Sequence, residues 1–285
     1  MFTKLSRLFF ALSAVLGLPA CGDDDTTGTG DVVFTIWGEE YVEDGIPTAE
    51  FEDGWEARFS KFLIVLGDVS VADGRAGEAG RLSEVRVFDL AVPGPHEIGA
   101  LKDVDARAWD RVGYTVRAAG ADTERHSSAT SQDLSRMRDE GYSVYVEGSA
   151  VKESQEMTFA WGFENSTRYD DCVQVDGARE THGIVVTNGG ADAVELTIHG
   201  DHFFYDDLAS PDAVLRFEPI AAADADGDGN VTLEELSAVK LVEIPEGSYG
   251  TGSASAVDDL GAFVRALTAT LGHFRGEGHC TASNL

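Results

Sequence analysis

The sequence predicts a mainly β protein, an antiparallel sandwich or jelly-roll-like domain followed by a small helical segment. Between residues 31 and 204, short segments rich in Val, Phe, Tyr and Thr alternate apolar with polar positions and are separated by Gly, Asp and Pro clusters. This pattern is typical of antiparallel strands. After residue 208 the apolar spacing becomes that of a helix. The chain has 285 residues, enough for one large domain with an additional segment.

The expected strands share β-branched and aromatic residues at alternate positions. They are residues 31–37, 58–66, 68–71, 85–88, 113–117, 142–148, 157–163, 183–186 and 194–199. Gly67 lies between two of these segments and predicts a bulge or a bend. One helix is expected within the domain, over residues 131–138, with Gly141 as its stop signal. These segments place the β-sandwich domain at residues 32–207.

Residues 208–285 are expected to form a helical segment. Ser210 and Pro211 have the pattern of a helix start, because proline is well tolerated at the first helical position. Apolar residues then follow helical spacing over residues 233–239 and again over residues 257–271. Gly272 is expected to end the second of these helices.

The beginning of the chain has the features of an export signal. Lys4 and Arg7 form a short positive region, and residues 8–18 are almost wholly apolar. This run is too short to span a bilayer as a resident helix. The next tetrapeptide ends in Cys21 and reads Leu18-Pro19-Ala20-Cys21. It resembles the lipobox of bacterial lipoproteins.

The resemblance implies that residues 1–20 are a signal peptide and that Cys21 carries lipid. Residues 21–31 would then be a flexible acidic tether rich in Gly and Thr. The protein would be anchored by lipid in a bacterial cell envelope, facing the periplasm or the cell exterior, and the anchor would be its contact with the membrane. The alternative is an ordinary signal peptide that is cut after Ala20.

The composition is strongly acidic. The chain carries 51 Asp and Glu against 21 Lys and Arg, a formal net charge of −30. Phosphate backbones are bound by clustered basic residues, so nucleic acid is excluded as a partner of this surface. A surface of this charge also attracts divalent cations.

Cys172 and Cys280 are the two cysteines that follow Cys21. In an exported protein two cysteines are expected to pair, and this disulfide would tie the C-terminal tail to the middle of the chain. The alternative is two free thiols.

Residues 224–235 read DADGDGNVTLEE and present oxygen-bearing side chains at alternate positions. They resemble the EF-hand loop, in which a calcium ion takes six to eight oxygen ligands. The resemblance places Gly229 at the sharp turn of the loop. It assigns calcium ligands to Asp224, Asp226, Asp228, Asn230 (through its backbone carbonyl), Thr232 and Glu235.

Two features depart from the EF-hand pattern. Pro219 lies in the entering segment, where it prevents a regular helix. The sequence also contains no second loop with which Val231, at the eighth position, could pair. A single loop on an exported protein therefore implies a calcium ion that stabilises the fold, as opposed to a calcium sensor; the alternative is an acidic turn that caps a helix.

Histidines mark a second candidate site. His199 and His202 flank Gly200 where an expected strand ends, and a bend at Gly200 would let them converge. With His182 from a neighbouring strand they would offer three nitrogen ligands, which suit zinc or copper. The alternative is that these histidines form hydrogen bonds in a polar turn. His273 and His279, near the tail, are expected to be surface residues.

No catalytic motif is identified in the sequence. The four tryptophans, Trp37, Trp55, Trp109 and Trp161, are expected to pack in the core, although rings of this kind can also stack on sugars. Three functions remain open: a non-enzymatic binding or structural lipoprotein with calcium as a stabilising ion, a zinc- or copper-binding protein, and a carbohydrate-binding protein or hydrolase.

Overall fold

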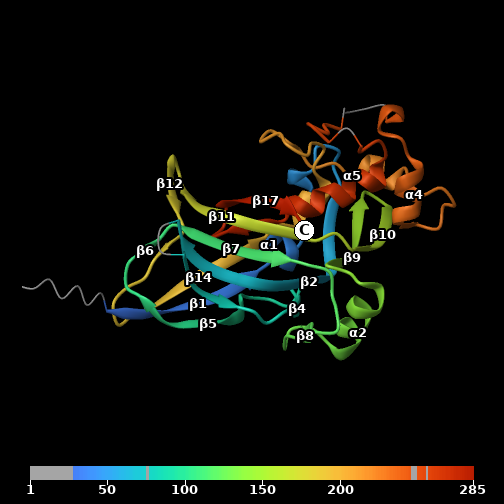
Figure 1. Ribbon diagram of the computed structural model, residues 1–285. Coiled ribbons are helices and arrows are strands. Elements are labelled where there is room, and N and C mark those ends of the chain that lie inside the picture. Colours follow the sequence, from blue (N-terminus) through green and yellow to red (C-terminus); the bar gives the residue numbers. More distant parts are fainter. Residues whose placement is uncertain (1–27, 75–76, 245–248, 255) are drawn as a thin grey trace, which may run out of the picture.

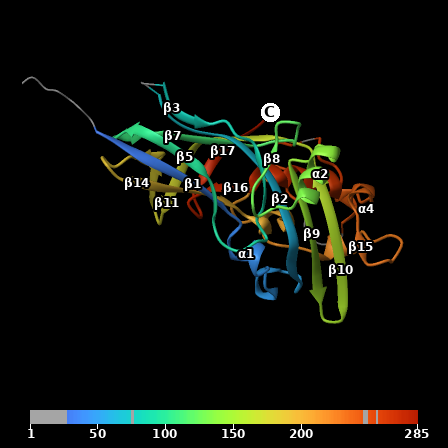
Figure 2. The same ribbon diagram turned by 90° about the horizontal axis from the view of Figure 1, so that it is seen from below.

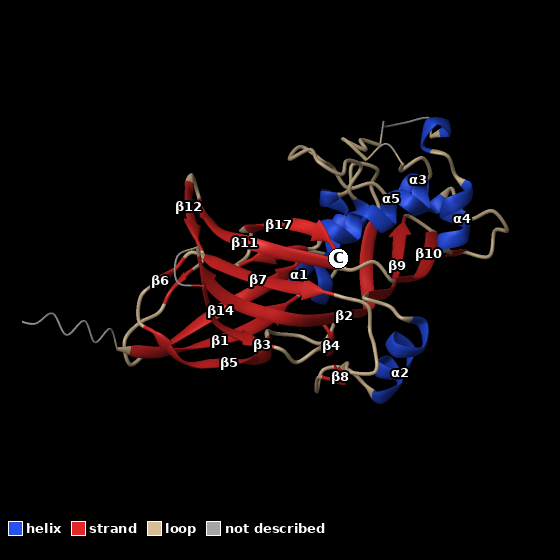
Figure 3. Cartoon of the chain, viewed as in Figure 1, coloured by secondary structure: helices blue, strands red, loops and turns tan. Residues whose placement is uncertain are grey.

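The computed structural model describes residues 28–285 except 75–76, 245–248 and 255. The signal peptide expected at residues 1–20, Cys21 and most of the expected tether lie outside the described residues. The described chain forms two packed layers of strands with helices gathered at one end, as Figures 1 and 3 show. The prediction of a mainly β, sandwich-type fold is confirmed.

The smaller layer is a four-stranded sheet in the order β16-β14-β1-β5. Its strands are β1 (Thr29–Trp37), β5 (His96–Asp105), β14 (Ala191–Ile198) and β16 (Gly272–Phe274). β1 pairs antiparallel with β5 but parallel with β14, with Asp31 opposite Ala191. The expected tether is therefore shorter than predicted, because residues 29–31 already belong to β1.

The larger layer centres on one long strand, β2 (Glu56–Asp73), which spans two of the segments predicted separately. Its register with β7 shifts between Gly67 and Ser70, so the bulge predicted at Gly67 is confirmed. The main path of this sheet contains β12 (Arg179–His182), β11 (Thr167–Asp176), β7 (Arg111–Val116), β2, β9 (Val144–Lys152), β10 (Gln155–Phe163) and β15 (Asn230–Val231).

Shorter strands extend the larger sheet at its margins. β17 (His279–Asn284) pairs with β11, β3 (Gly77–Leu82) and β4 (Arg86–Asp89) pair with β2, and β8 (Glu124–Arg125) pairs with β4. A separate two-stranded ribbon joins β6 (Ala108–Trp109) to β13 (Ile184–Val185).

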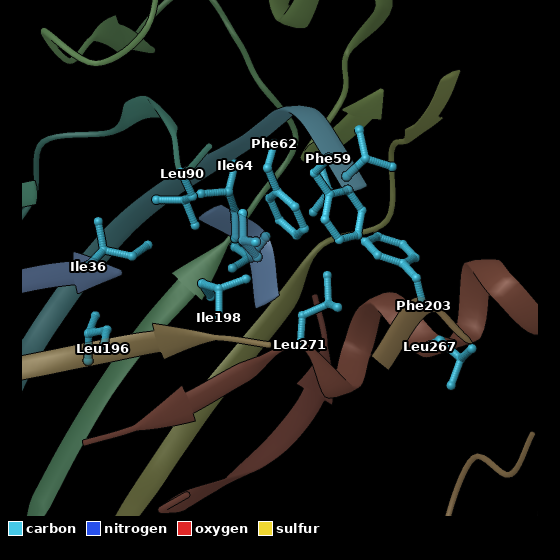
Figure 4. Packing of buried hydrophobic residues seen from close by; sticks show 14 of the residues in the cluster. Ile36, Phe59, Phe62, Ile64, Leu90, Leu196, Ile198, Phe203, Leu267 and Leu271 are labelled. Carbon is cyan, nitrogen blue, oxygen red and sulfur yellow. The ribbon is translucent and has the colours of Figure 1, made fainter. Parts of the chain in front are cut away.

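Alternation of side chains along the strands builds the core between the layers. On β1, Val32, Phe34 and Ile36 are fully buried while the residues between them are half-buried. Figure 4 shows Ile36 of β1 with Leu196 and Ile198 of β14 on one side, and Ile64 of β2 on the other. This burial of apolar surface is the main force that holds the two sheets together.

The tryptophan prediction is largely confirmed. Trp55, Trp109 and Trp161 are buried, so these rings are not available to stack on a sugar. Trp37 is half-buried and donates a hydrogen bond from Nε1 to Oε1 of Glu43, at 2.5 Å.

The helix predicted at 131–138 is present as α2 (Ser131–Glu140), and Gly141 ends it with a φ of 69°. The other helical elements are short. They are α1 (Glu39–Glu43), α3 (Glu218–Ala221), α4 (Leu233–Ala238), α5 (Leu260–Leu267) and the 3₁₀ turns η1 (Thr48–Glu50), η2 (Gly200–Phe204), η3 (Leu241–Glu243) and η4 (Thr268–Thr270).

Two details of the helical prediction are wrong. No helix begins at Ser210, because the Oδ1 atom of Asp207 accepts hydrogen bonds from the amides of Ala209 and Ser210 and holds them in a turn. The last helix begins at Leu260 and not near residue 257, because Asp259 caps it by accepting a hydrogen bond from the amide of Ala262 at 2.8 Å.

The residues after 208 contain strands as well as helices. β16 and β17 return the end of the chain to the two sheets. Leu236, Leu260 and Phe263 share one hydrophobic core with the strands. Figure 2 shows the β9–β10 pair extending beside α4 and β15, so the helices close one end of the sandwich.

The predicted disulfide is present. Cys172 of β11 and Cys280 of β17 are bonded, across a sequence separation of 108 residues. The bond lies where the register of these two strands shifts, between Asp170 and Val173. Among the described residues, no helix combines the length and apolar character needed to cross a bilayer.

Candidate metal centre

Three histidines from separate parts of the smaller layer meet near its edge. His199 follows β14, His202 lies in η2, and His273 lies in β16. β14 and β16 pair antiparallel with Thr197 opposite His273, so the strand register brings His273 to the end of β14. Each of the three side chains offers a nitrogen within 4.8 Å of the others.

Two glycines allow the close packing behind these histidines. A Cβ atom on Gly200 would lie 2.7 Å from Cγ2 of Val42 in α1, too close for any side chain. A Cβ atom on Gly272 would lie 2.5 Å from the hydroxyl oxygen of Tyr114. The chain turns at Gly200, where η2 begins, so the expected bend is present, and the glycine is also needed for space.

The imidazole rings are packed against one another. The rings of His199 and His273 are stacked, with centroids 3.9 Å apart and planes 8° apart. The ring of His202 lies edge-on to both, with centroids 5.3 Å and 5.0 Å away. The rings of His199 and His202 are buried and that of His273 is half-buried. The His202 ring also packs against Tyr205, with centroids 4.4 Å apart.

Hydrogen bonding determines the tautomer of His202. The hydroxyl of Thr270 donates to the backbone carbonyl of Leu267 at 2.9 Å, so the same oxygen accepts from Nδ1 of His202, also at 2.9 Å. His202 therefore carries its proton on Nδ1, and its Nε2 keeps a free lone pair. Metal-binding histidines are commonly oriented in this way by a hydrogen bond from the other ring nitrogen.

The other two histidines each bury a nitrogen that lacks a hydrogen bond. Nδ1 of His273 and Nε2 of His199 are both in this state. Oε2 of Glu39 lies 3.1 Å from Nε2 of His199, so this nitrogen has an ion-pair contact when the ring is protonated. Buried polar atoms without a partner are rare in folded proteins, and an ion is one explanation for them.

The protonation of the cluster differs from ring to ring. Burial, with the neighbouring His199, lowers the pKa of His273 to about 4. Burial, with His273 and His199, also lowers the pKa of His202. Burial opposes the charged form of His199 too, but Glu39 and Asp201 outweigh it and raise the pKa of that ring. His202 and His273 are therefore neutral near pH 7, the form that binds metals.

The three histidines line a cavity of about 440 Å³. Its wall also contains three acidic residues, Glu39, Asp201 and Glu277, and two tyrosines, Tyr41 and Tyr205. The Tyr205 hydroxyl donates to Oδ2 of Asp201 at 3.2 Å, and burial raises the pKa of this carboxyl group. The described lining contains no Lys or Arg, so it favours cations over anions.

His182 does not belong to this group, contrary to prediction. It is exposed on β12, where it pairs in register with Val173, and it is not among the three histidines whose nitrogens lie within 4.8 Å of one another. His273 takes the predicted place of His182. His279 is exposed on β17, as expected. The sequence signal for His273 was weak, since Gly-His-Phe is too short a run to predict a strand.

The predicted calcium loop is a turn at the surface in which three carboxylates lie close together. Asp224, Asp226 and Glu235 each place an oxygen within 4.8 Å of the others. Asp224 accepts hydrogen bonds from the amides of Gly227 and Gly229, at 2.9 and 3.0 Å. Gly229 has a φ of 80°, the left-handed conformation that the sharp turn was expected to need.

The remaining predicted ligands take part in the turn itself. Oδ1 of Asp228 accepts from the amide of Asn230 at 2.7 Å. Thr232 caps α4, and Oε2 of Glu235 accepts from its amide and its hydroxyl at 2.9 and 2.8 Å. The three residues whose oxygens lie within 4.8 Å of one another do not include Asp228, Asn230 or Thr232, although these lie in the same turn.

In EF-hand pairs the residue at the eighth position pairs with a second loop. Here the larger sheet takes the place of that loop. Asn230 and Val231 form β15, which pairs parallel with Thr158 and Phe159 of β10. Val231 is fully buried, and its carbonyl accepts a hydrogen bond from Nε1 of Trp161 at 2.9 Å. The loop is therefore attached directly to the sandwich.

Comparison with models of protein families, with curated proteins and with solved structures finds no significant match to this chain. The fold and the site define a β-sandwich whose helical end contains two groups of potential metal ligands, one of nitrogen and one of oxygen atoms.

Proposed function

We propose that this protein binds a transition-metal ion, zinc or copper, through His199, His202 and His273. The observation that carries the proposal is the convergence of three buried or half-buried imidazoles within 4.8 Å, two of them with a buried nitrogen that has no hydrogen-bond partner. Imidazole nitrogen is a preferred ligand of both metals, and three such ligands are typical of zinc sites that bind water.

The test compares two single variants of the mature chain, that is, the chain without the expected signal peptide at residues 1–20. His273→Ala removes one member of the cluster and should weaken zinc or copper binding at least about 100-fold, since a three-ligand site becomes a two-ligand site. His182→Ala removes an exposed histidine outside the cluster and should leave binding unchanged. Metal content after purification without chelator and competition titration measure both effects. Equal affinities for the two variants would refute the assignment.

We also propose calcium binding at residues 224–235, as a second, stabilising function. The observation that favours it is the orientation of Asp224, Asp226 and Glu235 toward one another in a loop attached to β10. Carboxylates held this close repel each other, and a hard divalent cation with oxygen ligands relieves that repulsion.

The calcium proposal predicts a rise in melting temperature with millimolar Ca²⁺, because ligand that binds only the folded state stabilises it. Glu235→Gln should abolish the rise, whereas Glu234→Gln, at the neighbouring residue of α4, should keep it. A melting temperature that chelator and calcium leave unchanged would contradict the proposal.

The cell-envelope location remains a proposal that the export signal supports. The lipobox-like residues 18–21 and the acidic segment after them suit an exported lipoprotein anchored through Cys21. Cys21→Ser should release the protein from the membrane fraction of a bacterial host. A variant that stays in the membrane fraction would argue against lipid anchoring.

A further inference from the structure

We propose that an ion held by the three histidines activates a water molecule and that Glu39 accepts the proton of this water, so that the site hydrolyses small neutral esters. The inference rests on the proposed function, because it requires the histidines to bind the ion. It adds a reaction and a substrate class to what would otherwise be a binding site.

The histidines supply fewer ligands than a four-coordinate ion needs. Within the described residues, the group offers three nitrogen atoms and leaves a four-coordinate ion one ligand short. The cavity of about 440 Å³ borders all three rings, so a water molecule can reach the space beside them. Zinc sites with three protein ligands and an open position are the catalytic kind, whereas structural sites are closed by a fourth side chain.

Glu39 is placed to act on a water at that position. Its Oε2 lies 3.1 Å from Nε2 of His199, and its side chain lines the same cavity with 22% of its surface exposed. The residue also has a φ of 58°, a left-handed conformation that it shares with five other described non-glycine residues. Strained backbone of this kind is concentrated at functional sites, where the surrounding structure holds it in place.

The proposed reaction is a simple hydrolysis. An ion held by the histidines would supply a water of lowered pKa, and Glu39 would accept one proton of this water while the water oxygen forms a new C–O bond to the ester carbonyl carbon. The bond from that carbon to the alcohol oxygen then breaks, and the leaving oxygen takes the proton from Glu39. One water and one ester become one acid and one alcohol, with no other reactant.

The charge of the cavity limits the substrate. Glu39, Asp201 and Glu277 face it, and its described lining has no Lys or Arg. An anionic ester would meet three carboxylates and lose affinity through like-charge repulsion. We therefore infer a neutral acyl ester small enough for this cavity.

The experiment uses the mature chain, apo and loaded with zinc, with 4-nitrophenyl acetate as the neutral probe. We expect zinc-dependent release of nitrophenol, lost in His199→Ala. Glu39→Gln should lower kcat by about 100-fold, within the range of general-base catalysis, while its zinc content stays at one equivalent. Glu40→Gln, an exposed neighbour on α1, is the matched control and should keep the parent kcat.

The outcomes separate the two proposals. Zinc bound at one equivalent without zinc-dependent hydrolysis would overturn the hydrolytic inference and leave metal binding intact. Absence of zinc binding would overturn both. Unchanged kcat in Glu39→Gln would overturn the role of Glu39. The 4-nitrophenyl ester of succinate, which carries a negative charge, should react at least tenfold more slowly, and an equal rate would overturn the substrate class.

Discussion

At the scale of single residues, the orientation of the histidine cluster depends on side chains that are not themselves among the proposed ligands. Thr270 is such a residue, since its hydroxyl accepts the Nδ1 proton of His202 while donating to Leu267. The side chain thereby directs the free lone pair of His202 and makes Nε2 available.

Thr270→Val tests this orientation. Valine has nearly the same shape and lacks the hydroxyl, so zinc affinity should fall by about 10- to 100-fold although every ligand remains. Thr270→Ser keeps the hydroxyl and should bind zinc like the parent. Competition titration with a chromophoric chelator gives both affinities, and equal binding by the valine and serine variants would show that the hydrogen bond is unimportant.

At the scale of elements, α2 is held to the larger sheet by a buried charge network. Lys61 of β2 contacts Asp89 at 2.7 Å and Asp133 of α2 at 3.3 Å. Asp133 also completes a capping box with Thr130, the residue that begins the helix. One carboxylate therefore both starts α2 and attaches it to β2.

Asp133 makes stability depend on pH. Burial alone would raise the pKa of this carboxyl group, but the Thr130 hydrogen bonds and Lys61 outweigh it and lower the pKa. Because the folded pKa is below the unfolded value of about 3.9, the stabilisation is present above that value and is lost as pH falls through the folded pKa.

Asp133→Asn should therefore lower the free energy of unfolding by about 1 kcal/mol at pH 7, with a smaller loss at pH 3. Asp139→Asn, exposed on the same helix, is the control and should have little effect. Urea denaturation at the two pH values measures the difference. An equal loss of unfolding free energy at pH 7 and pH 3 would contradict the role of the Asp133 charge.

At the scale of the whole molecule, the end of the chain closes the fold. β16 joins the smaller sheet, β17 joins the larger sheet, and the disulfide between Cys172 and Cys280 covalently links β17 to β11. The strand that carries His273 thus depends on how the C-terminal residues are anchored.

Removal of the disulfide should destabilise the whole protein. In the chain-entropy model, opening a loop closed across 108 residues costs up to about 4–5 kcal/mol. The double variant Cys172→Ala, Cys280→Ala should unfold at a correspondingly lower concentration of denaturant, and reduction of the parent should have a similar effect. A stability equal to that of the oxidised parent would refute this contribution.

Local patterns in the sequence were sufficient for the elements that short-range chemistry determines. Period-two alternation predicted β1, β2 and β10, a glycine marked the bulge at Gly67, and the oxygen spacing marked the turn at 224–235. These features depend on neighbours within a few residues, so the sequence contains their cause.

Tertiary structure alone decided which histidines meet. His273 joins His199 because β16 pairs with β14, and His182 is held away on β12 because that strand pairs with β11. Strand partners and register arise from burial across the whole core, with contributions from residues far apart in the chain. The sequence by itself determined a mainly β protein, its disulfide and its acidic loop, and the pairing of distant strands determined the group of three histidines.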